Sequence, residues 1–128
     1  MPQGPAKSQR AEVDNPRFRA LLAKLADEPR FAPVLKAFAA TQQQRKGFGS
    51  NGLAVNRKLF ALISRGRLVV KLPRERVDAL VASRKALRFD PRHGRKMKEW
   101  AVITDPRASW RDLVAEAHDF VEKPQDSR

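Results

Sequence analysis

Few side chains in this sequence are of the types that perform catalysis. The two histidines lie far apart, and neither has a carboxylate at a spacing that would orient its ring as a general base. We expect His93 in a basic loop and His118 on the polar side of the last helix, so both are interpreted as surface residues. The serines fall in turns or at helix starts, where hydroxyls make local hydrogen bonds. We therefore predict no catalytic residue and no enzyme.

Metal and thiol chemistry have equally few candidates. The chain has no cysteine, which excludes a disulfide, a thiolate zinc site and a cysteine nucleophile. Two separated histidines do not make a transition-metal site. Asp112, Glu116 and Asp119 recur at helical spacing, but such an acidic face is usually solvated. We expect no metal site and no cofactor.

Glycines beside basic residues can cradle a phosphate through backbone N–H groups, and one such stretch occupies residues 45–52. It is not a P-loop, because that motif ends in Gly-Lys-Ser or Gly-Lys-Thr and opens a helix, whereas these glycines precede an expected strand. We interpret the stretch as a tight entry to that strand, with Phe48 in the core.

The strongest chemical signal is positive charge. Lys and Arg number 27 against 14 Asp and Glu, a net charge of +13, and residues 45–98 alone carry a surplus of that size. Such a segment is typical of a nucleic-acid-binding surface, because each cation that neutralises a phosphate releases counterions. The candidate phosphate-binding residues are Arg45, Lys46, Arg57, Lys58, Arg65, Arg67, Lys71, Arg88, Arg92, Arg95, Lys96 and Lys98.

These residues form one patch if the turns at Arg57 and Arg65 and the loop at 92–96 lie on the same side of the fold. We expect no exposed aromatic stripe among them, since Phe60 and Phe89 are interpreted as core, so binding should be electrostatic and weakly sequence-selective. Two alternatives remain open. The charge could serve only solubility, or an apolar sheet face could bind a protein partner or a second copy of the chain.

The length and the 41% apolar content predict a single domain over residues 14–123, between a disordered tail at 1–13 and a polar tail at 124–128. Apolar residues at helical spacing predict helices over about 15–27 and 31–41. Asp14 or Asn15 can cap the first of these, and Pro16 suits its first turn.

Beyond residue 44 the apolar pattern becomes that of strands. Residues 53–55, 58–64 and 67–72 predict a three-stranded antiparallel meander, in which the apolar run 59–63 indicates a central strand covered on both faces. A helix after Pro73, strands over 86–90 and 96–104, and a last helix capped by Ser109 complete the order. We predict an α+β two-layer sandwich with a five-stranded antiparallel sheet, in the order α-β(3)-α-β(2)-α with an extra N-terminal helix.

Residues 47–63, GFGSNGLAVNRKLFALI, resemble the opening of the TfoX N-terminal domain, where a Phe-Gly-Gly-like turn leads into a strand, a tight turn and a Lys-x-Phe-Ala strand. Lys71, Pro73 and the helix that follows also resemble this family and the related MmcQ/YjbR group. The run KEWAVI at 98–103 is similar to the tryptophan-bearing final strand of the latter. The resemblance covers about residues 45–121 and implies the same α-β(3)-α-β(2)-α architecture and a DNA-binding or transcription-related role.

We therefore expect a small, non-enzymatic TfoX/YjbR-like protein that binds nucleic acid, with DNA as its partner. The alternative is a chaperone-like or homodimeric protein-interaction module, since secretion chaperones share the fold that the resemblance implies. No apolar run is long enough to span a membrane and residues 1–10 lack a signal-peptide core, so we expect a cytoplasmic protein with no membrane partner.

Overall fold

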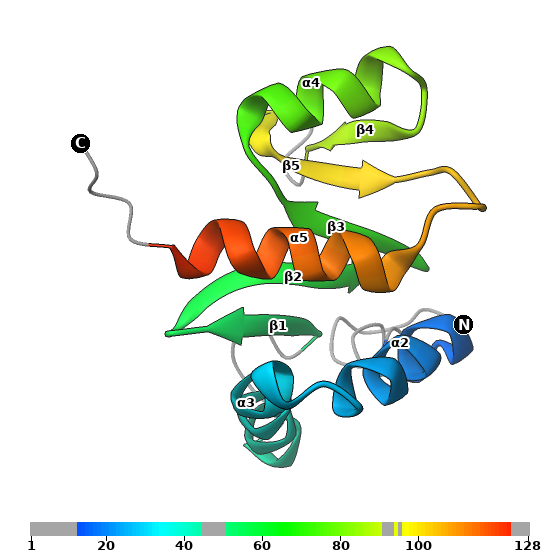
Figure 1. Cartoon of the computed structure of the whole chain (residues 1–128). Helices are drawn as coiled ribbons and strands as arrows, with labels where there is room; N and C mark the ends of the chain where they lie inside the picture. Colours follow the sequence, from blue (N-terminus) through cyan, green and yellow to red (C-terminus); the bar gives the residue numbers. More distant parts are fainter. Residues whose placement is uncertain (1–12, 45–50, 91–93, 95, 124–128) are drawn as a thin grey trace.

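The computed structural model describes residues 13–44, 51–90, 94 and 96–123 (Figure 1). It is an α+β sandwich with a five-stranded antiparallel sheet, as predicted. The elements are α2 (Pro16–Ala26), the 3₁₀ helix η1 (Pro29–Phe31), α3 (Ala32–Gln44), β1 (Gly52–Val55), β2 (Lys58–Ser64), β3 (Arg67–Lys71), α4 (Arg74–Ala82), β4 (Ala86–Phe89), β5 (Met97–Ile103) and α5 (Trp110–Glu122).

The predicted tails at 1–12 and 124–128 lie outside the described residues. Val13, which the prediction places in the tail, is partly buried and packs against the core. Val13 therefore belongs with the packed structure, because an apolar side chain next to a helix start can still be buried. No helix in the described part of the chain is long and apolar enough to cross a membrane.

Helix α2 begins where the sequence predicts its cap. The Asn15 side chain accepts hydrogen bonds from the backbone N–H groups of Arg17 at 2.8 Å and Phe18 at 3.1 Å, and Pro16 occupies the first turn. The Phe18 ring then meets the Phe38 ring of α3 edge to face, with centroids 5.9 Å apart. The two helices therefore pack against each other, and α3 also packs against β1.

The strand order is β1-β2-β3-β5-β4, with every neighbouring pair antiparallel, so β2 is a central strand as predicted. Strand β2 contains a bulge, because Leu53 pairs with Ala61 and Ala54 pairs with Leu59, which leaves Phe60 without a partner on β1. Phe60 and Ala61 are both fully buried, and the bulge accounts for two buried residues in succession. The prediction that β2 is covered equally on both faces is wrong, because Leu59 and Leu62 are only half-buried.

The two faces of the sheet differ in what covers them. Ala61, Val70 and Ala101 are cross-strand neighbours and belong to the core. Helix α5 lies across this inner face over β2 and β3, and α4 packs on β4 and β5 (Figure 1). The outer face is defined by a second row of cross-strand neighbours, which consists of Leu62, Val69, Val102 and Leu87.

Ion pairs tie α5 to the segment between α2 and η1. Arg111 Nε donates to Glu28 Oε2 at 2.7 Å, and a second Arg111 nitrogen also contacts Glu28. The hydrogen bonds from Arg111 hold the pKa of the Glu28 carboxyl below its usual range, and the charge of Arg30 acts in the same direction. The carboxylate form of Glu28 therefore favours the folded state.

We expect this pair to make stability depend on acidity. Because the pKa of Glu28 is lower in the folded state, its contribution is present above its unfolded pKa and is lost as the pH falls through the folded value. Glu28→Gln should therefore lower the thermal midpoint relative to wild type at about pH 7, and the difference should shrink toward about pH 2. Thermal unfolding followed by circular dichroism measures both midpoints. Glu75→Gln, at an exposed position of α4, is the control, and equal pH dependence in the two variants would contradict the assignment.

Candidate nucleic-acid interface

The predicted convergence of Arg57 and Arg65 is wrong, because β2 separates them. The turn that contains Arg57 precedes β2, whereas the turn that contains Arg65 follows it. A strand of this length rises about 3.4 Å per residue, so the two turns lie roughly 20 Å apart at opposite ends of the sheet. Arg67 lies with Arg65, at the first residue of β3. Consecutive turns of a meander always alternate between the two ends of a sheet.

A different group of cations comes together at the end of the sheet where β3 finishes. The register pairs Ala61 with Val70 and Lys71 with Trp100, so β2 and β5 both start at this end. Helix α4 starts here as well, directly after β3. We call this group the basic end, and it consists of Arg57, Lys58, Lys71, Arg74, Lys96 and Lys98.

Arg74 was missing from the residues predicted by the sequence. The signal that could have found it is Pro73, which ends the β3 region and opens α4, so the next residue must lie at the same end of the sheet as Lys71.

Most cations of the basic end are exposed and have no acidic partner. Among the described residues, no carboxylate lies within 4.0 Å of the charged groups of Arg57, Lys58, Arg74, Lys96 or Lys98. Lys71 is the exception, with its Nζ 3.9 Å from Glu99 Oε1. Glu75, Glu99 and Asp90, which directly follows β4 at this end, are the acidic residues nearby, and six cations outnumber them.

Several arginines elsewhere in the fold are paired with neighbouring acids. Arg30 Nη1 lies 2.7 Å from Asp119 Oδ1, and Arg76 Nε lies 2.8 Å from Glu116 Oε2. The predicted site residue Arg88 belongs to this class, because its Nη2 lies 2.5 Å from Asp78 Oδ1 and links β4 to α4. Arg88 is therefore structural. The residues that lie outside the described part of the chain are Arg45, Lys46, Phe48, Arg92, His93 and Arg95.

The interpretation of Phe89 as a core residue is wrong. Phe89 is half-buried and lies outside the cluster that forms the core. Its ring lies 6.5 Å from that of Trp100, which is also half-buried. Strand β4 is at the edge of the sheet, where an apolar side chain has neighbours on one side only. An aromatic pair therefore lies next to the basic end, contrary to prediction.

His118 is also placed differently from the prediction, because it is only 2% exposed. Its ring meets those of Phe31 and Phe60 edge to face, at centroid distances of 4.9 and 5.4 Å. His118 follows Val114 by four positions and precedes Val121 by three, so it lies on the apolar stripe of α5. The residue type suggested that His118 lies at the surface, but its position on the apolar stripe of α5 determines that it is buried.

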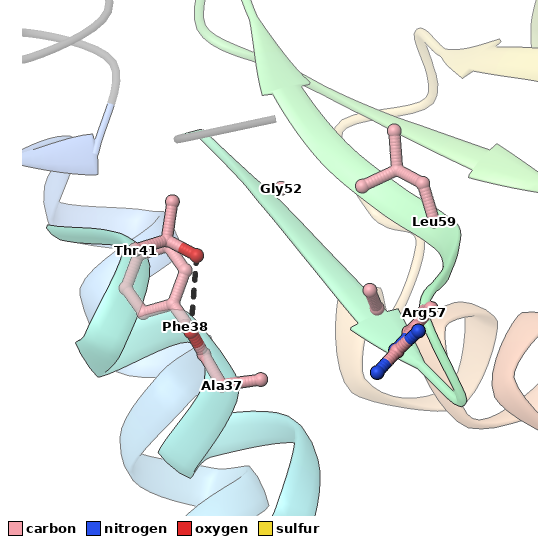
Figure 2. Close-up of a pocket in the computed structure, with 7 residues that line it drawn as sticks. Ala37, Phe38, Thr41, Gly52, Arg57 and Leu59 are labelled. Atoms are coloured by element: carbon pink, nitrogen blue, oxygen red, sulfur yellow. Dashed lines mark hydrogen bonds between the residues drawn. The ribbon is translucent and has the colours of Figure 1, made fainter. Parts of the chain in front are cut away.

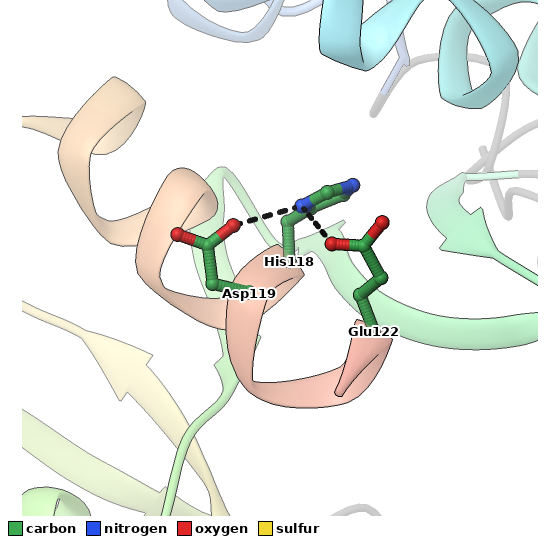
Figure 3. A group of neighbouring side chains, drawn as sticks. All are labelled: His118, Asp119 and Glu122. Carbon is green, nitrogen blue, oxygen red and sulfur yellow. Dashed lines mark hydrogen bonds and ion pairs between the residues drawn. The ribbon is translucent and has the colours of Figure 1, made fainter. Parts of the chain in front are cut away.

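Two carboxylates of the same helix approach the buried ring (Figure 3). His118 Nδ1 lies 3.1 Å from Asp119 Oδ1 and 4.0 Å from Glu122 Oε1, so the prediction that no carboxylate orients this ring is wrong. These three groups are close enough together to share a cation. However, Asp119 Oδ1 also accepts from Arg30 at 2.7 Å. The ring nitrogen therefore contacts an oxygen that is already paired with arginine, which is a structural role.

A surface hollow of about 310 Å³ lies between α3 and the β1–β2 hairpin (Figure 2). Arg57 is the one charged residue among the described residues that line it. The other lining residues are Ala37, Phe38, Thr41, Gly52, Ala54 and Leu59. The hollow thus gives the basic end an apolar neighbour on the β1 side. Its wall depends on Gly52, because a Cβ there would lie 2.6 Å from Leu59 Cδ1.

Known proteins were compared with the chain by sequence and by structure. No family model, curated protein or solved structure matches it. The resemblance to the TfoX/YjbR group therefore stays a prediction. The functional proposal depends on the residues of the basic end and their surroundings.

Proposed function

We propose that this protein binds nucleic acid through the basic end of its sheet. The observation that supports the proposal most directly is the meeting of five exposed cations from three separate segments, with no carboxylate of the described chain within 4.0 Å. Neighbouring strands lie about 5 Å apart, so the group extends over roughly 10 Å from β2 to β5, enough to contact neighbouring phosphates. The TfoX/YjbR resemblance supports the same role.

Binding should depend steeply on salt. Each neutralised phosphate releases condensed counterion, so four or five contacts on duplex DNA should give a plot of log affinity against log salt concentration a slope of about −3.6 to −4.5. Fluorescence anisotropy with a labelled oligonucleotide over a salt series measures this slope. Absence of binding at low salt would overturn the proposal.

The location of the interface can be tested with charge-matched variants. We expect the double variant Lys58→Gln and Lys98→Gln to weaken binding at least about tenfold at moderate salt and to reduce the slope by about 1 to 2. Lys24→Gln with Lys36→Gln is the control, because it removes the same charge from exposed positions on α2 and α3. Equal losses in the two variants would show that net charge, rather than the basic end, determines affinity.

A protein partner or a second copy is the other candidate function, and one observation favours it. Leu87 is 55% exposed and Met97 is 39% exposed, both near the edge that β4 forms. Exposed apolar side chains on an edge strand are a common basis for association. Light scattering of the purified protein at low and high salt measures its mass, and a dimer that persists in high salt would support this candidate.

A further inference from the structure

The outer face of the sheet combines three kinds of side chain in a defined register. Its apolar row consists of Leu62, Val69, Val102 and Leu87, one from each of four adjacent strands. Val69, in the middle, is fully buried, while Leu62 and Val102 are half-buried and Leu87 is exposed. The row faces away from α4 and α5, because alternate residues on the same strands belong to the core.

An aromatic pair lies beside this row. Trp100 precedes Val102 by two positions on β5, so it is on the same face, and its cross-strand partner is Lys71. The Phe89 ring lies 6.5 Å from the Trp100 ring at an interplanar angle of 52°. Both side chains are partly accessible, which leaves aromatic surface at the boundary between the apolar row and the basic end.

Cations border the same face on both sides. Lys71 follows Val69 by two positions on β3, so it lies on this face and is the cross-strand partner of Trp100. Lys98 lies two residues before Trp100 at the start of β5, where the β4–β5 pairing is irregular, and therefore belongs to the same end of the sheet as the aromatic pair. Arg67 precedes Val69 by two positions and lies on the opposite side of the row from Lys71. Lys98 and Arg67 are exposed and have no carboxylate within 4.0 Å in the described chain. The contact between Lys71 and Glu99 is solvent-exposed, and pairs of this kind yield readily to phosphate.

This combination favours one class of ligand over two others. Single-stranded nucleic acid has exposed base faces that stack on aromatic rings and phosphates that lysines hold. In a duplex the base faces are stacked on one another, so a duplex would contact the cations but would not stack on the aromatic pair. A second copy bound through a two-fold axis would bring the same basic face against itself, which like charges oppose.

We propose that the outer face binds single-stranded nucleic acid, with a base stacked on Trp100 and the adjacent phosphates held by Lys71 and Lys98. Arg67 holds the strand at the other side of the apolar row. The proposal rests on the proposed function, because it specifies which form of nucleic acid the basic end and the adjoining face recognise. Stacking is tolerant of base identity, so sequence preference should be small.

The test compares a labelled dT oligonucleotide of about ten nucleotides with a duplex of the same length. We expect the wild type to bind the single strand more tightly. Trp100→Ala should weaken binding to dT roughly tenfold to a hundredfold and change duplex affinity less than about twofold, whereas Trp100→Phe should retain most of the affinity. Circular dichroism confirms that each variant is folded.

A second pair of variants avoids any change to the aromatic side chains. Leu87 is exposed, so Leu87→Glu and Leu87→Lys should both fold, but only the glutamate should repel the strand.

Fluorescence gives a separate measurement of stacking. A Trp110→Phe background leaves Trp100 as the single tryptophan, and the fluorescence of Trp100 should fall when dT is added.

The outcomes separate the two proposals. Binding to neither nucleic acid at low salt overturns the proposed function and this inference together. Equal or tighter binding to duplex, with no effect of Trp100→Ala, overturns the single-strand inference and leaves the basic end supported. A stable dimer that Leu87→Glu dissociates, without dT binding, would assign the outer face to a second copy.

Discussion

Replacing Phe60 with alanine should lower the free energy of unfolding by about 3–5 kcal/mol, which is the range for truncating a large aromatic side chain in a core. Phe60 is fully buried, and the β2 bulge turns it toward α5, where it meets the His118 ring. Its loss removes a contact on which burial of that histidine depends. Urea unfolding followed by circular dichroism measures the change.

A matched control separates this packing effect from a general effect of truncation in the sheet. Leu87→Ala removes an apolar side chain from β4, but this side chain is 55% exposed, so we expect a change within about 0.5 kcal/mol. A similar loss for Phe60→Ala and Leu87→Ala would contradict the inner and outer face assignment. The control is also useful for binding measurements, because it leaves the fold intact.

Gly52→Ala should destabilise the protein by about 1–3 kcal/mol through overpacking. A Cβ at this position would lie 2.6 Å from Leu59 Cδ1 and 3.0 Å from the Ala61 carbonyl oxygen. The first atom ends a flexible side chain, but the second belongs to the backbone of β2 and cannot move without disturbing the β1–β2 pairing. Chemical unfolding of the variant measures the cost.

A double-mutant cycle divides this cost between the two contacts. In a Leu59→Ala background the side-chain clash is removed, so Gly52→Ala should cost less there, with a coupling of about 1 kcal/mol. The remaining cost then reports the backbone contact. If Gly52→Ala costs the same in both backgrounds, Leu59 does not limit the space around Gly52.

The cationic side chains of this protein have two kinds of surroundings. Some arginines are paired with acids of other elements, as in the contacts of Arg76 with Glu116, Arg30 with Asp119 and Arg88 with Asp78, and these pairs join elements of the fold. Most cations of the basic end are exposed, and no carboxylate of the described chain lies within 4.0 Å of them. The net charge of +13 therefore does not show that the positive potential is distributed unevenly over the surface.

Local sequence rules predicted the elements well. The Asn15 cap, the Ser109 cap, which accepts a hydrogen bond from the Asp112 N–H at 3.2 Å, and the three-stranded meander are all present. Caps and tight turns depend on residues within three or four positions of each other, so sequence spacing contains the relevant information. The boundaries of most elements differ from the predictions by one to three residues.

The predicted site was less accurate, because its geometry depends on contacts between distant segments. Arg57 and Arg65 are close in sequence but lie at opposite ends of β2, whereas Lys58 and Lys98 are distant in sequence and lie at the same end. Lys98 lies near Lys71 only because β5 lies between β3 and β4 in the sheet. Strand order cannot be read from local spacing when a helix separates the strands.

The sequence by itself determined the α+β class, the order of the elements and the basic character of the central segment, since composition and local periodicity are properties of short stretches. Tertiary structure alone decided that the His118 ring packs between two phenylalanines, that Arg88 forms an ion pair with Asp78, and that Trp100 faces outward beside Lys71. The physical reason is that burial and pairing depend on which surfaces the chain brings together. A residue's type fixes the chemistry it can perform, and the packing of remote segments fixes whether that chemistry is exposed.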